Sequence, residues 1–188
     1  MTKKVRFSRS DWVALGMARL SQDGTEAIKL EAICTSAGLT RGSFYYHFAD
    51  HGTFLIAITQ EWADRQTRDV AAQADDADGP DAAAQSLTNA ALQIDYRLEL
   101  GIRELARRVP AVADLVQSTD ETRLAVLSEL YQRRFGMGAE RAAQFATLEY
   151  AAFCGAILLD PDMSAEKQSE LATLLDRIMA QAAGILAH

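Results

Sequence analysis

The segment 30–55, LEAICTSAGLTRGSFYYHFADHGTFL, constrains the fold of this chain more than any other stretch. Its apolar residues recur at helical spacing as far as Ala37. Gly38 then ends the helix, because a residue without a Cβ atom readily adopts the left-handed conformation. Thr40 can accept the backbone N–H of Ser43 and so begin a second, short helix. Two helices joined by a tight turn, with the amino end of the second exposed, are typical of a DNA-reading helix-turn-helix.

Composition and punctuation predict an all-α fold. Hydrophobic residues make up 49% of the 188 residues, prolines number three and β-branched residues are sparse, so helices are favoured over sheets. The first helix is expected to begin with Ser10 as its cap, and a long fourth helix runs from Thr53 to Ala74, where the acidic segment 75–81 ends it. We expect about nine helices in all, the last five over residues 82–94, 96–108, 110–135, 139–159 and 165–186.

The segment AGLTRGSFYYHF resembles the signature of the TetR family of bacterial transcriptional repressors. Ten positions carry the resemblance: Ala37, Gly38, Leu39, Thr40, Gly42, Ser43, Phe44, Tyr45, His47 and Phe48. It implies a nine-helix fold with an amino-terminal, three-helix DNA-binding domain, placed here at residues 1–51. Residues 52–188 would then form a helical effector-binding and dimerisation domain.

The resemblance also implies roles for individual residues. Tyr45 and His47 would contact phosphate, while Arg41, Ser43 and Tyr46 would face base edges. Arg41 has the strongest chemistry for base reading, because a guanidinium can donate two hydrogen bonds to guanine. The full set of expected DNA-binding residues is Lys29, Thr40, Arg41, Gly42, Ser43, Tyr45, Tyr46, His47 and His51.

Two positions depart from the family pattern. Lys29 replaces the hydroxyl residue that usually caps the second helix, and either solvent exposure or phosphate contact would suit it. His51 stands where the family usually has a lysine, so the phosphate contact usual at this position is expected to be weaker. Asp50 can still cap the fourth helix. The basic residues Lys3, Lys4, Arg6 and Arg9 form either a disordered end or an arm along the DNA.

Charge is divided unevenly along the chain. The formal net charge is −7, yet residues 1–51 carry seven lysines and arginines against five acids. The remaining residues carry twelve against twenty-one. Because phosphate attraction acts over a Debye length of about 8 to 10 Å, the local excess of positive charge suits DNA binding despite the acidic total.

Sites for catalysis, metals or cofactors are not evident. His47 and His51 are four residues apart, but the sequence between them predicts a helix break, and no Gly-rich phosphate loop or nucleophile elbow occurs. Cys34 and Cys154 are interpreted as buried free thiols. Acids such as Glu99, at helical spacing from arginines, are interpreted as a solvated face with ion pairs. We therefore expect no enzyme activity, metal or cofactor.

The carboxy-terminal helices offer candidates for an effector pocket and a partner surface. Aromatic and apolar residues that could line a pocket are Trp62, Leu92, Tyr96, Leu127, Tyr131 and Tyr150. Heptad-like and small residues favour a homodimer through the last two helices, although an ordinary intramolecular helix pair would give the same pattern. The expected dimer residues are Phe145, Ala152, Gly155, Ala156, Leu159, Leu171, Leu174, Leu175, Ile178 and Ala182.

Together these features predict a cytoplasmic regulator, because the longest apolar runs are expected to be too short and too often interrupted by charge to span a bilayer, and the amino terminus lacks a signal-peptide core. The resemblance implies a homodimeric repressor that binds a palindromic operator and is released by a small-molecule effector. Two alternatives remain open. One is an architectural or effector-independent DNA-binding protein, and the other is a helical protein-interaction module with a degenerate DNA-reading end.

Overall fold

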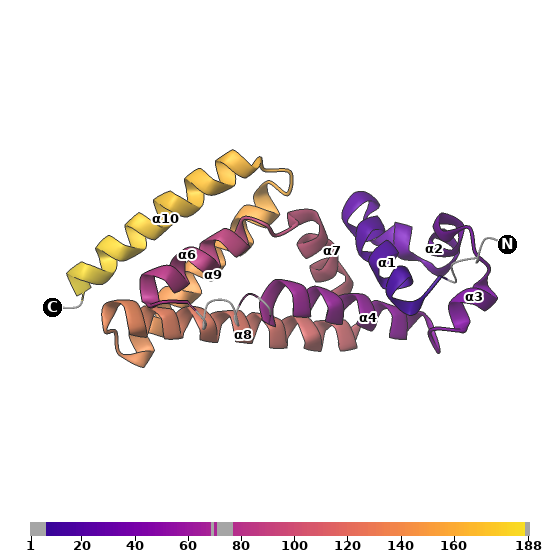
Figure 1. Cartoon of the computed structure of the whole chain (residues 1–188), viewed down its shortest axis with the longest axis horizontal. Coiled ribbons are helices and arrows are strands. Elements are labelled where there is room, and N and C mark those ends of the chain that lie inside the picture. The colour runs from indigo at the N-terminus through magenta and orange to yellow at the C-terminus, as the bar shows by residue number, and fades with distance from the viewer. Residues whose placement is uncertain (1–6, 69, 71–76, 187–188) are drawn as a thin grey trace. The chain divides into compact units, whose positions relative to one another are not determined.

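A computed structural model of the chain describes residues 7–68, 70 and 77–186 (Figure 1). Within these ranges the chain forms nine α-helices and no strands, which confirms the predicted all-α class. The chain divides into two compact units. The first unit comprises Met1–Ala63 and Arg97–Val116, and the second comprises Asp64–Tyr96 and Gln117–His188.

The first unit contains the predicted helix-turn-helix. Its elements are α1 (Arg9–Asp23), the 3₁₀ turn η1 (Thr25–Ile28), α2 (Leu30–Ala37), α3 (Arg41–Tyr45), α4 (His51–Ala63), most of α7 (Tyr96–Ala106) and the first turns of α8 (Pro110–Phe135). Its core is centred on four fully buried aromatic rings. Phe44 lies 5.1 to 5.3 Å, centroid to centroid, from Trp12, Phe48 and Phe54.

Two glycines allow helices of the first unit to approach closely. A Cβ atom at Gly16 of α1 would lie 2.5 Å from Ile58 Cδ1 and 2.8 Å from Phe54 Cζ, both on α4. At Gly101 of α7 it would lie 2.8 Å from two carbon atoms of Leu20, on α1. Both α4 and α7 therefore pack directly on α1.

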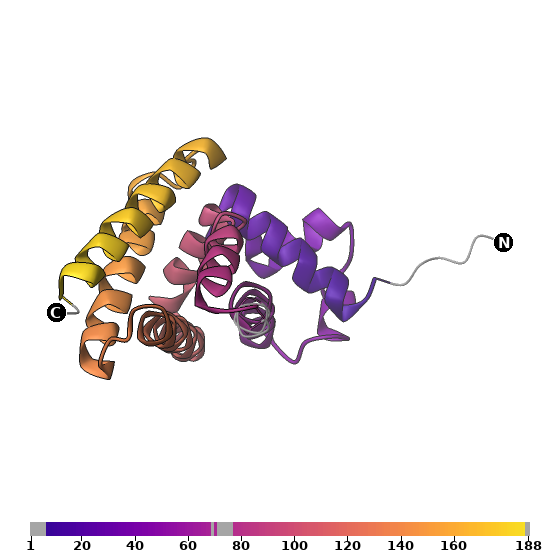
Figure 2. The same cartoon turned by 60° about the vertical axis from the view of Figure 1, so that its left-hand side comes forward.

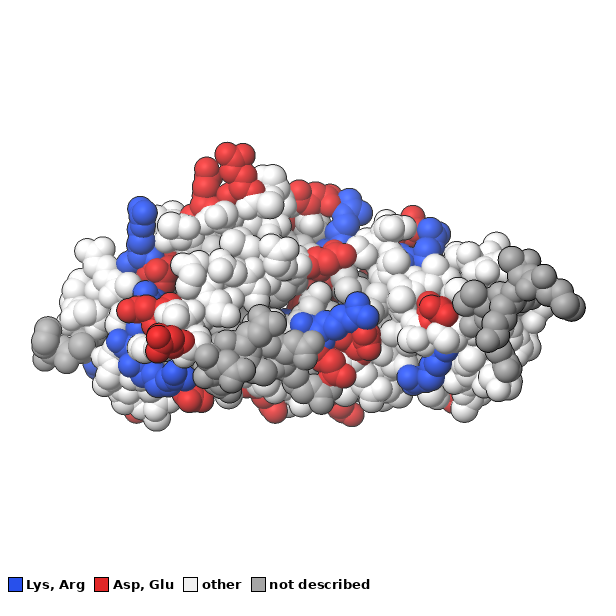
Figure 3. Space-filling model, viewed as in Figure 1, with Lys and Arg blue, Asp and Glu red and all other residues white. Residues whose placement is uncertain are grey.

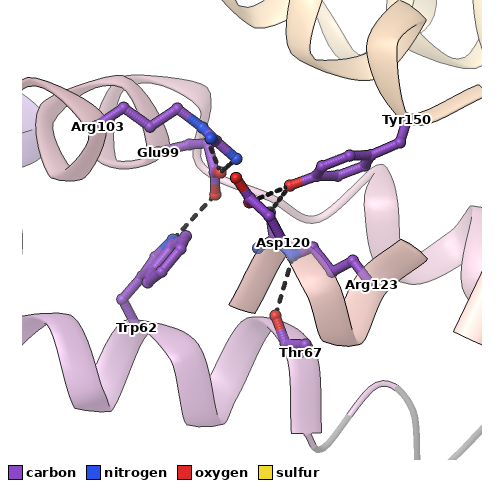
Figure 4. Close-up of polar contacts among 7 residues, drawn as sticks. All are labelled: Trp62, Thr67, Glu99, Arg103, Asp120, Arg123 and Tyr150. Atoms are coloured by element: carbon purple, nitrogen blue, oxygen red, sulfur yellow. Dashed lines mark hydrogen bonds and ion pairs between the residues drawn. The ribbon is translucent and has the colours of Figure 1, made fainter. Parts of the chain in front are cut away.

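A buried carboxylate connects α4 and α7 within this unit. Glu99 is fully buried, and it accepts a hydrogen bond of 2.9 Å from Trp62 Nε1 (Figure 4). Arg103 donates to the other carboxylate oxygen through Nε and Nη2 at 3.1 and 2.9 Å. The interpretation of Glu99 as part of a solvated face is therefore wrong. A buried charge needs such hydrogen-bonded partners, and only the tertiary fold supplies Trp62.

The helix boundaries differ from the predictions at the amino-terminal end. Ser8, not Ser10, caps α1, in a capping box in which Asp11 N–H donates to Ser8 Oγ at 3.1 Å and the Asp11 carboxylate accepts from Ser8 N. The helix predicted over 53–74 begins earlier, at His51, and α4 ends at Ala63. A π-helical turn, η2 (Asp64–Arg68), follows. Residues 71–76, which include the predicted helix end and the start of the acidic linker, lie outside the described residues.

The second unit contains η2, α6 (Pro80–Ala91), the remainder of α8, α9 (Ala139–Leu159) and α10 (Ala165–Leu186). The bounds of α8, α9 and α10 agree with the predictions, and α9 and α10 run side by side in both views (Figures 1 and 2). A second core joins α8, α9 and α10 around Tyr131, Phe145, Met179 and Ala183.

Among the described helices, α9 is long and apolar enough to cross a membrane by length and composition alone. A single such helix is weak evidence, because a helix in a protein core passes the same test. In this chain α9 contributes Ala142, Phe145 and Ala146 to the second core.

The two compact units group the chain differently from the domain boundary predicted between residues 51 and 52, which stays a prediction. Because Trp62 and Glu99 are joined and Gly101 packs on Leu20, the whole of α4 and residues 97–116 cluster with the helix-turn-helix. Neither cysteine forms a disulfide within the described part of the chain, and Cys34 is buried as expected, whereas Cys154 is only half-buried.

Candidate nucleic-acid interface and cavity

The turn between α2 and α3 follows the predicted glycine geometry. Gly38 has φ 63° and ψ 29°, and its N–H donates to the carbonyls that end α2, while Leu39 N–H donates to Cys34 O at 3.0 Å. Thr40 then caps α3 by accepting the backbone N–H of Ser43 at 3.2 Å. The Gly38 turn and the Thr40 cap together set the direction in which the amino end of α3 presents its side chains.

The surface of α3 combines polar and aromatic side chains. Thr40, Arg41 and Gly42 are exposed and Ser43 is half-buried. Phe44 is fully buried, whereas Tyr45 and Tyr46 are 50% and 66% exposed. The two tyrosines are the large hydrophobic residues that the described part of the first unit leaves in solvent. Such exposed side chains on a five-residue helix are available to a groove or to phosphates.

Two of the expected DNA-contacting cations are held by neighbouring carboxylates. Arg41 Nη2 pairs with Glu31 across the helix-turn-helix, and Lys29 pairs with Glu26. Lys29 stands at the N-cap of α2 and makes no side-chain cap bond, as its replacement of a hydroxyl residue predicts. All four side chains are more than half exposed, so both cations can exchange these partners for phosphate or base.

His47 and His51 each bind a backbone carbonyl of another segment. Nε2 of His47 lies 3.0 Å from Phe7 O, and Nε2 of His51 lies 2.8 Å from Ile28 O. Because a carbonyl oxygen only accepts, each Nε2 donates, and Nδ1 is the nitrogen left for another contact. His51 thus fastens the start of α4 to η1, a role that the sequence did not indicate.

Asp50 caps α4 as predicted. Its Oδ1 accepts the backbone N–H of Thr53 at 2.6 Å and the Thr53 hydroxyl at 2.9 Å. Both bonds lower the pKa of the Asp50 carboxyl, and the bond from the backbone N–H has the larger effect. The cap holds the amino end of α4 directly after the helix-turn-helix.

The second unit contains a large, partly open cavity of about 900 Å³. Five of the six residues predicted to line a pocket do so: Leu92, Tyr96, Leu127, Tyr131 and Tyr150. Trp62 does not, because it is fully buried in the first unit, where its indole N–H is bound by Glu99. Aliphatic side chains such as Leu87, Leu130 and Leu175 cover much of the remaining wall.

One cluster of polar side chains in the cavity wall is centred on Arg123 of α8. The Arg123 guanidinium donates to Thr67 Oγ1 at 3.0 Å and to the Tyr150 hydroxyl at 3.1 Å. Its central carbon lies 6.0 Å from the ring centroids of Tyr150 and Phe153. Tyr150 in turn donates to Asp120 at 2.6 Å (Figure 4). The side chain of Arg123 is therefore fixed by groups from η2, α8 and α9.

A second polar group joins α8 to α9. The Tyr131 hydroxyl donates to Glu149 Oε2 at 2.5 Å. Burial, followed by the charge of Glu149, raises the pKa of Tyr131. Burial also raises the pKa of Glu149, and Asp176 adds to that effect while Tyr131 and Arg134 oppose it. Sequence reasoning missed Glu149 and Arg123, because neither belongs to a recognisable motif.

Comparison with known proteins places the amino-terminal part of the chain. Residues 14–58 match the model described as bacterial regulatory proteins, tetR family. Residues 14–58 of this chain therefore form a TetR-family amino-terminal domain. This match confirms the predicted resemblance to the TetR family over the DNA-binding segment.

Solved structures share the fold of this chain over nearly its whole length. A transcriptional regulator from Rhodococcus sp. Rha1 matches with a TM-score of 0.76 and 18% identity, covering 93% of this chain and 97% of its own. A TetR regulator from Legionella pneumophila matches with 0.76 and 16%, covering 95% and 99%. A transcriptional regulator from Saccharomonospora viridis, in complex with choline, matches with 0.75 and 12%, covering 92% and 95%. No curated protein sequence matches.

The residues expected at a TetR-type dimer surface occupy three kinds of position. Phe145 is buried in the second core, so it is not available to a partner, and Ala182 packs against that core. The others line the cavity: Ala152, Gly155, Ala156, Leu159, Leu171, Leu174, Leu175 and Ile178. Of these, Leu159, Leu171, Leu174 and Ile178 are also exposed to solvent.

Proposed function

We propose that this chain is a cytoplasmic repressor that binds a palindromic operator as a homodimer and releases it when a small molecule binds the second unit. The observation that carries the proposal is the exposed face of α3, capped by Thr40 and presenting Arg41, Tyr45 and Tyr46. A helix held in this way fits the major groove with its amino-terminal residues at base edges.

An unpartnered apolar surface supports the homodimer. Large hydrophobic side chains that are exposed in the described part of the second unit all lie on α9 and α10: Leu148, Leu158, Leu159, Leu171, Leu174, Ile178 and Ile185. Figure 3 shows broad uncharged surface over this part of the chain, with charged side chains at its margins. A second copy would cover such a surface and supply the second α3 that two half-sites need, about 34 to 36 Å apart.

The cavity supports release by a small molecule. Its volume of about 900 Å³ and mainly apolar wall with a few fixed polar groups suit an organic ligand. The related Saccharomonospora viridis regulator holds choline, so the fold can accept a small organic molecule. A ligand can release DNA only to the extent that it binds the DNA-free conformation more tightly.

Selection from a random double-stranded DNA pool tests the proposal. We expect enrichment of a palindrome whose half-sites lie one helical turn apart, and loss of the complex when a metabolite mixture is added. Enrichment without any response to metabolites would instead indicate effector-independent DNA binding. Absence of any enriched sequence would refute the repressor, because neither an architectural DNA-binding protein nor a protein-interaction module selects an operator.

A further inference from the structure

The charges in the cavity wall point to the chemical class of the ligand, an inference that rests on the proposed effector function. Six charged side chains line the cavity: Arg123, Arg134, Lys167, Glu149, Asp160 and Asp176. Three of them are positive and three are negative. The class of ligand therefore depends on which of these charges already has a partner of opposite charge.

The cations of the wall are compensated. Arg134 donates to Asp81 on α6 at 2.8 Å and to Asp176 on α10 at 2.7 Å. Lys167 pairs with Asp160 at 3.0 Å. Arg123 is held by two hydroxyl groups and two aromatic rings, and the hydroxyl of Tyr150 connects it to the carboxylate of Asp120. Lys167 thereby neutralises Asp160, whereas Asp81 and Asp176 share the single positive charge of Arg134.

Glu149 is in a different position. Its carboxylate receives a hydrogen bond from a neutral phenol, Tyr131, while the nearby cation Arg134 is shared between two other acids. If all are ionised, three carboxylates, Glu149, Asp176 and Asp81, surround one guanidinium. A buried carboxylate without its own cation is costly, and a ligand that brings a positive charge removes that cost.

We propose that the cavity binds an amphiphilic organic cation whose charged group pairs with Glu149 and whose apolar part lies against Leu127, Leu130 and Leu175. An anion would face the net negative charge around Glu149 and would have to displace the partners of Arg123 or Arg134. A neutral apolar molecule would leave the Glu149 carboxylate uncompensated. The cation alone fits both the apolar wall and its charge.

The pH dependence of ligand affinity gives an independent test of the pairing between the ligand cation and Glu149. The groups that face Glu149 are Tyr131 and Arg134 on α8 and Asp176 on α10, and burial with Asp176 raises its pKa. A protonated Glu149 attracts a cation less, so the affinity for a permanent cation should rise with pH through the titration of Glu149. Below that pKa the affinity falls up to tenfold per pH unit.

Calorimetry with three ligands that share a decyl chain tests the proposal on the full-length protein. Decyltrimethylammonium, decanol and decanoate carry a positive, no and a negative charge. We expect decyltrimethylammonium to bind about 10-fold or more tighter than decanol, the range of a charge-assisted contact, and decanoate to bind most weakly. In Glu149→Gln the affinity for decyltrimethylammonium should fall to that for decanol, and the affinity for decanol should stay unchanged. The affinity for the cation should also lose its dependence on pH.

The controls separate this inference from the proposed function. Glu140→Gln removes an exposed carboxylate from the same helix and should change none of the affinities. In Glu149→Gln the amide oxygen can still accept from Tyr131, so the variant should melt near the wild-type temperature. Tightest binding of decanoate, equal loss of all three ligands in Glu149→Gln, or no binding of any ligand would each overturn the inference. Selective cation binding that leaves the selected operator bound would refute release by effector while the charge preference stands.

Discussion

At the scale of single residues, Arg41 has two competing partners. In the free protein it pairs with Glu31, and both side chains are exposed. An exposed ion pair contributes about 0 to 1 kcal/mol, whereas a bidentate contact to guanine contributes about 1 to 3 kcal/mol of discrimination. The contact with Glu31 therefore does not prevent Arg41 from reading a base.

Replacement of Arg41 by alanine should relax sequence preference at one base pair of each half-site. The expected loss is about 1 to 3 kcal/mol of discrimination there, with smaller changes elsewhere. Binding to a panel of single-base operator variants measures this. Lys29→Ala is the matched control, because loss of the phosphate contact predicted for Lys29 should weaken all sequences alike and lower the salt slope by about one. Equal losses at every position in Arg41→Ala would contradict base reading.

The contribution of His51 shows where sequence reasoning ends at this scale. The resemblance to the TetR family identifies this histidine as an unusual replacement of lysine. It could not show that the ring donates to the carbonyl of Ile28, 23 residues earlier. That bond depends on how η1 and α4 pack, and packing is a tertiary property. Thr40, Gly38 and Asp50 were predictable because their caps involve neighbours three or four residues away.

At the scale of elements, the crossing of α1 and α4 depends on the absence of a side chain at Gly16. Gly16→Ala should lower the free energy of unfolding by about 1 to 3 kcal/mol, because the added Cβ meets Ile58 and Phe54, both fully buried and unable to move into solvent. Chemical denaturation measures the change. Gly184→Ala is the control, since a Cβ there meets nothing within 4 Å and alanine favours the helix. Unchanged stability in Gly16→Ala would contradict the close packing.

The joint between α4 and α7 depends on the charge of Glu99. Glu99→Gln should cost about 2 kcal/mol of unfolding free energy, because the amide can still accept from Trp62 but no longer neutralises the partly buried Arg103. Urea denaturation followed by circular dichroism measures it. Glu129→Gln, in an exposed pair with Arg133 at 3.9 Å, should change stability by less than about 0.5 kcal/mol. Similar effects of the two variants would argue against a structural role for the buried network.

Element boundaries were predictable where glycine and proline interrupt the chain. Pro110, Gly136, Gly138 and Pro161 delimit α8 and α9 correctly. The π-helical turn after Ala63 was not predictable, because no residue in Asp64–Arg68 forbids a regular helix. The burial of Glu99 was not predictable for a related reason. A glutamate four residues before an arginine has the same pattern on a solvated helix and on one whose carboxylate is buried by another helix.

At the scale of the whole molecule, the proposed homodimer and the proposed cavity share α9 and α10. Leu159, Leu171, Leu174 and Ile178 are both exposed and part of the cavity wall, so changes there would confuse ligand binding with association. Leu148 on α9 and Ile185 on α10 are 62% and 69% exposed and do not belong to the wall, so they can test association by itself.

A glutamate at either position should separate the subunits. Leu148→Glu and Ile185→Glu each place a charge, and in the dimer its copy, in an apolar interface where desolvation is costly. Light scattering should give twice the 20.5 kDa chain mass for the wild type and the single mass for both variants. Affinity for the selected palindrome should fall by about 100-fold or more, because one α3 reaches one half-site. Gln144→Glu and Gln181→Glu, exposed positions one turn earlier on the same helices, should remain dimeric. A wild type that is monomeric at micromolar concentration, or variants that remain dimers, would show that another surface or none joins the subunits.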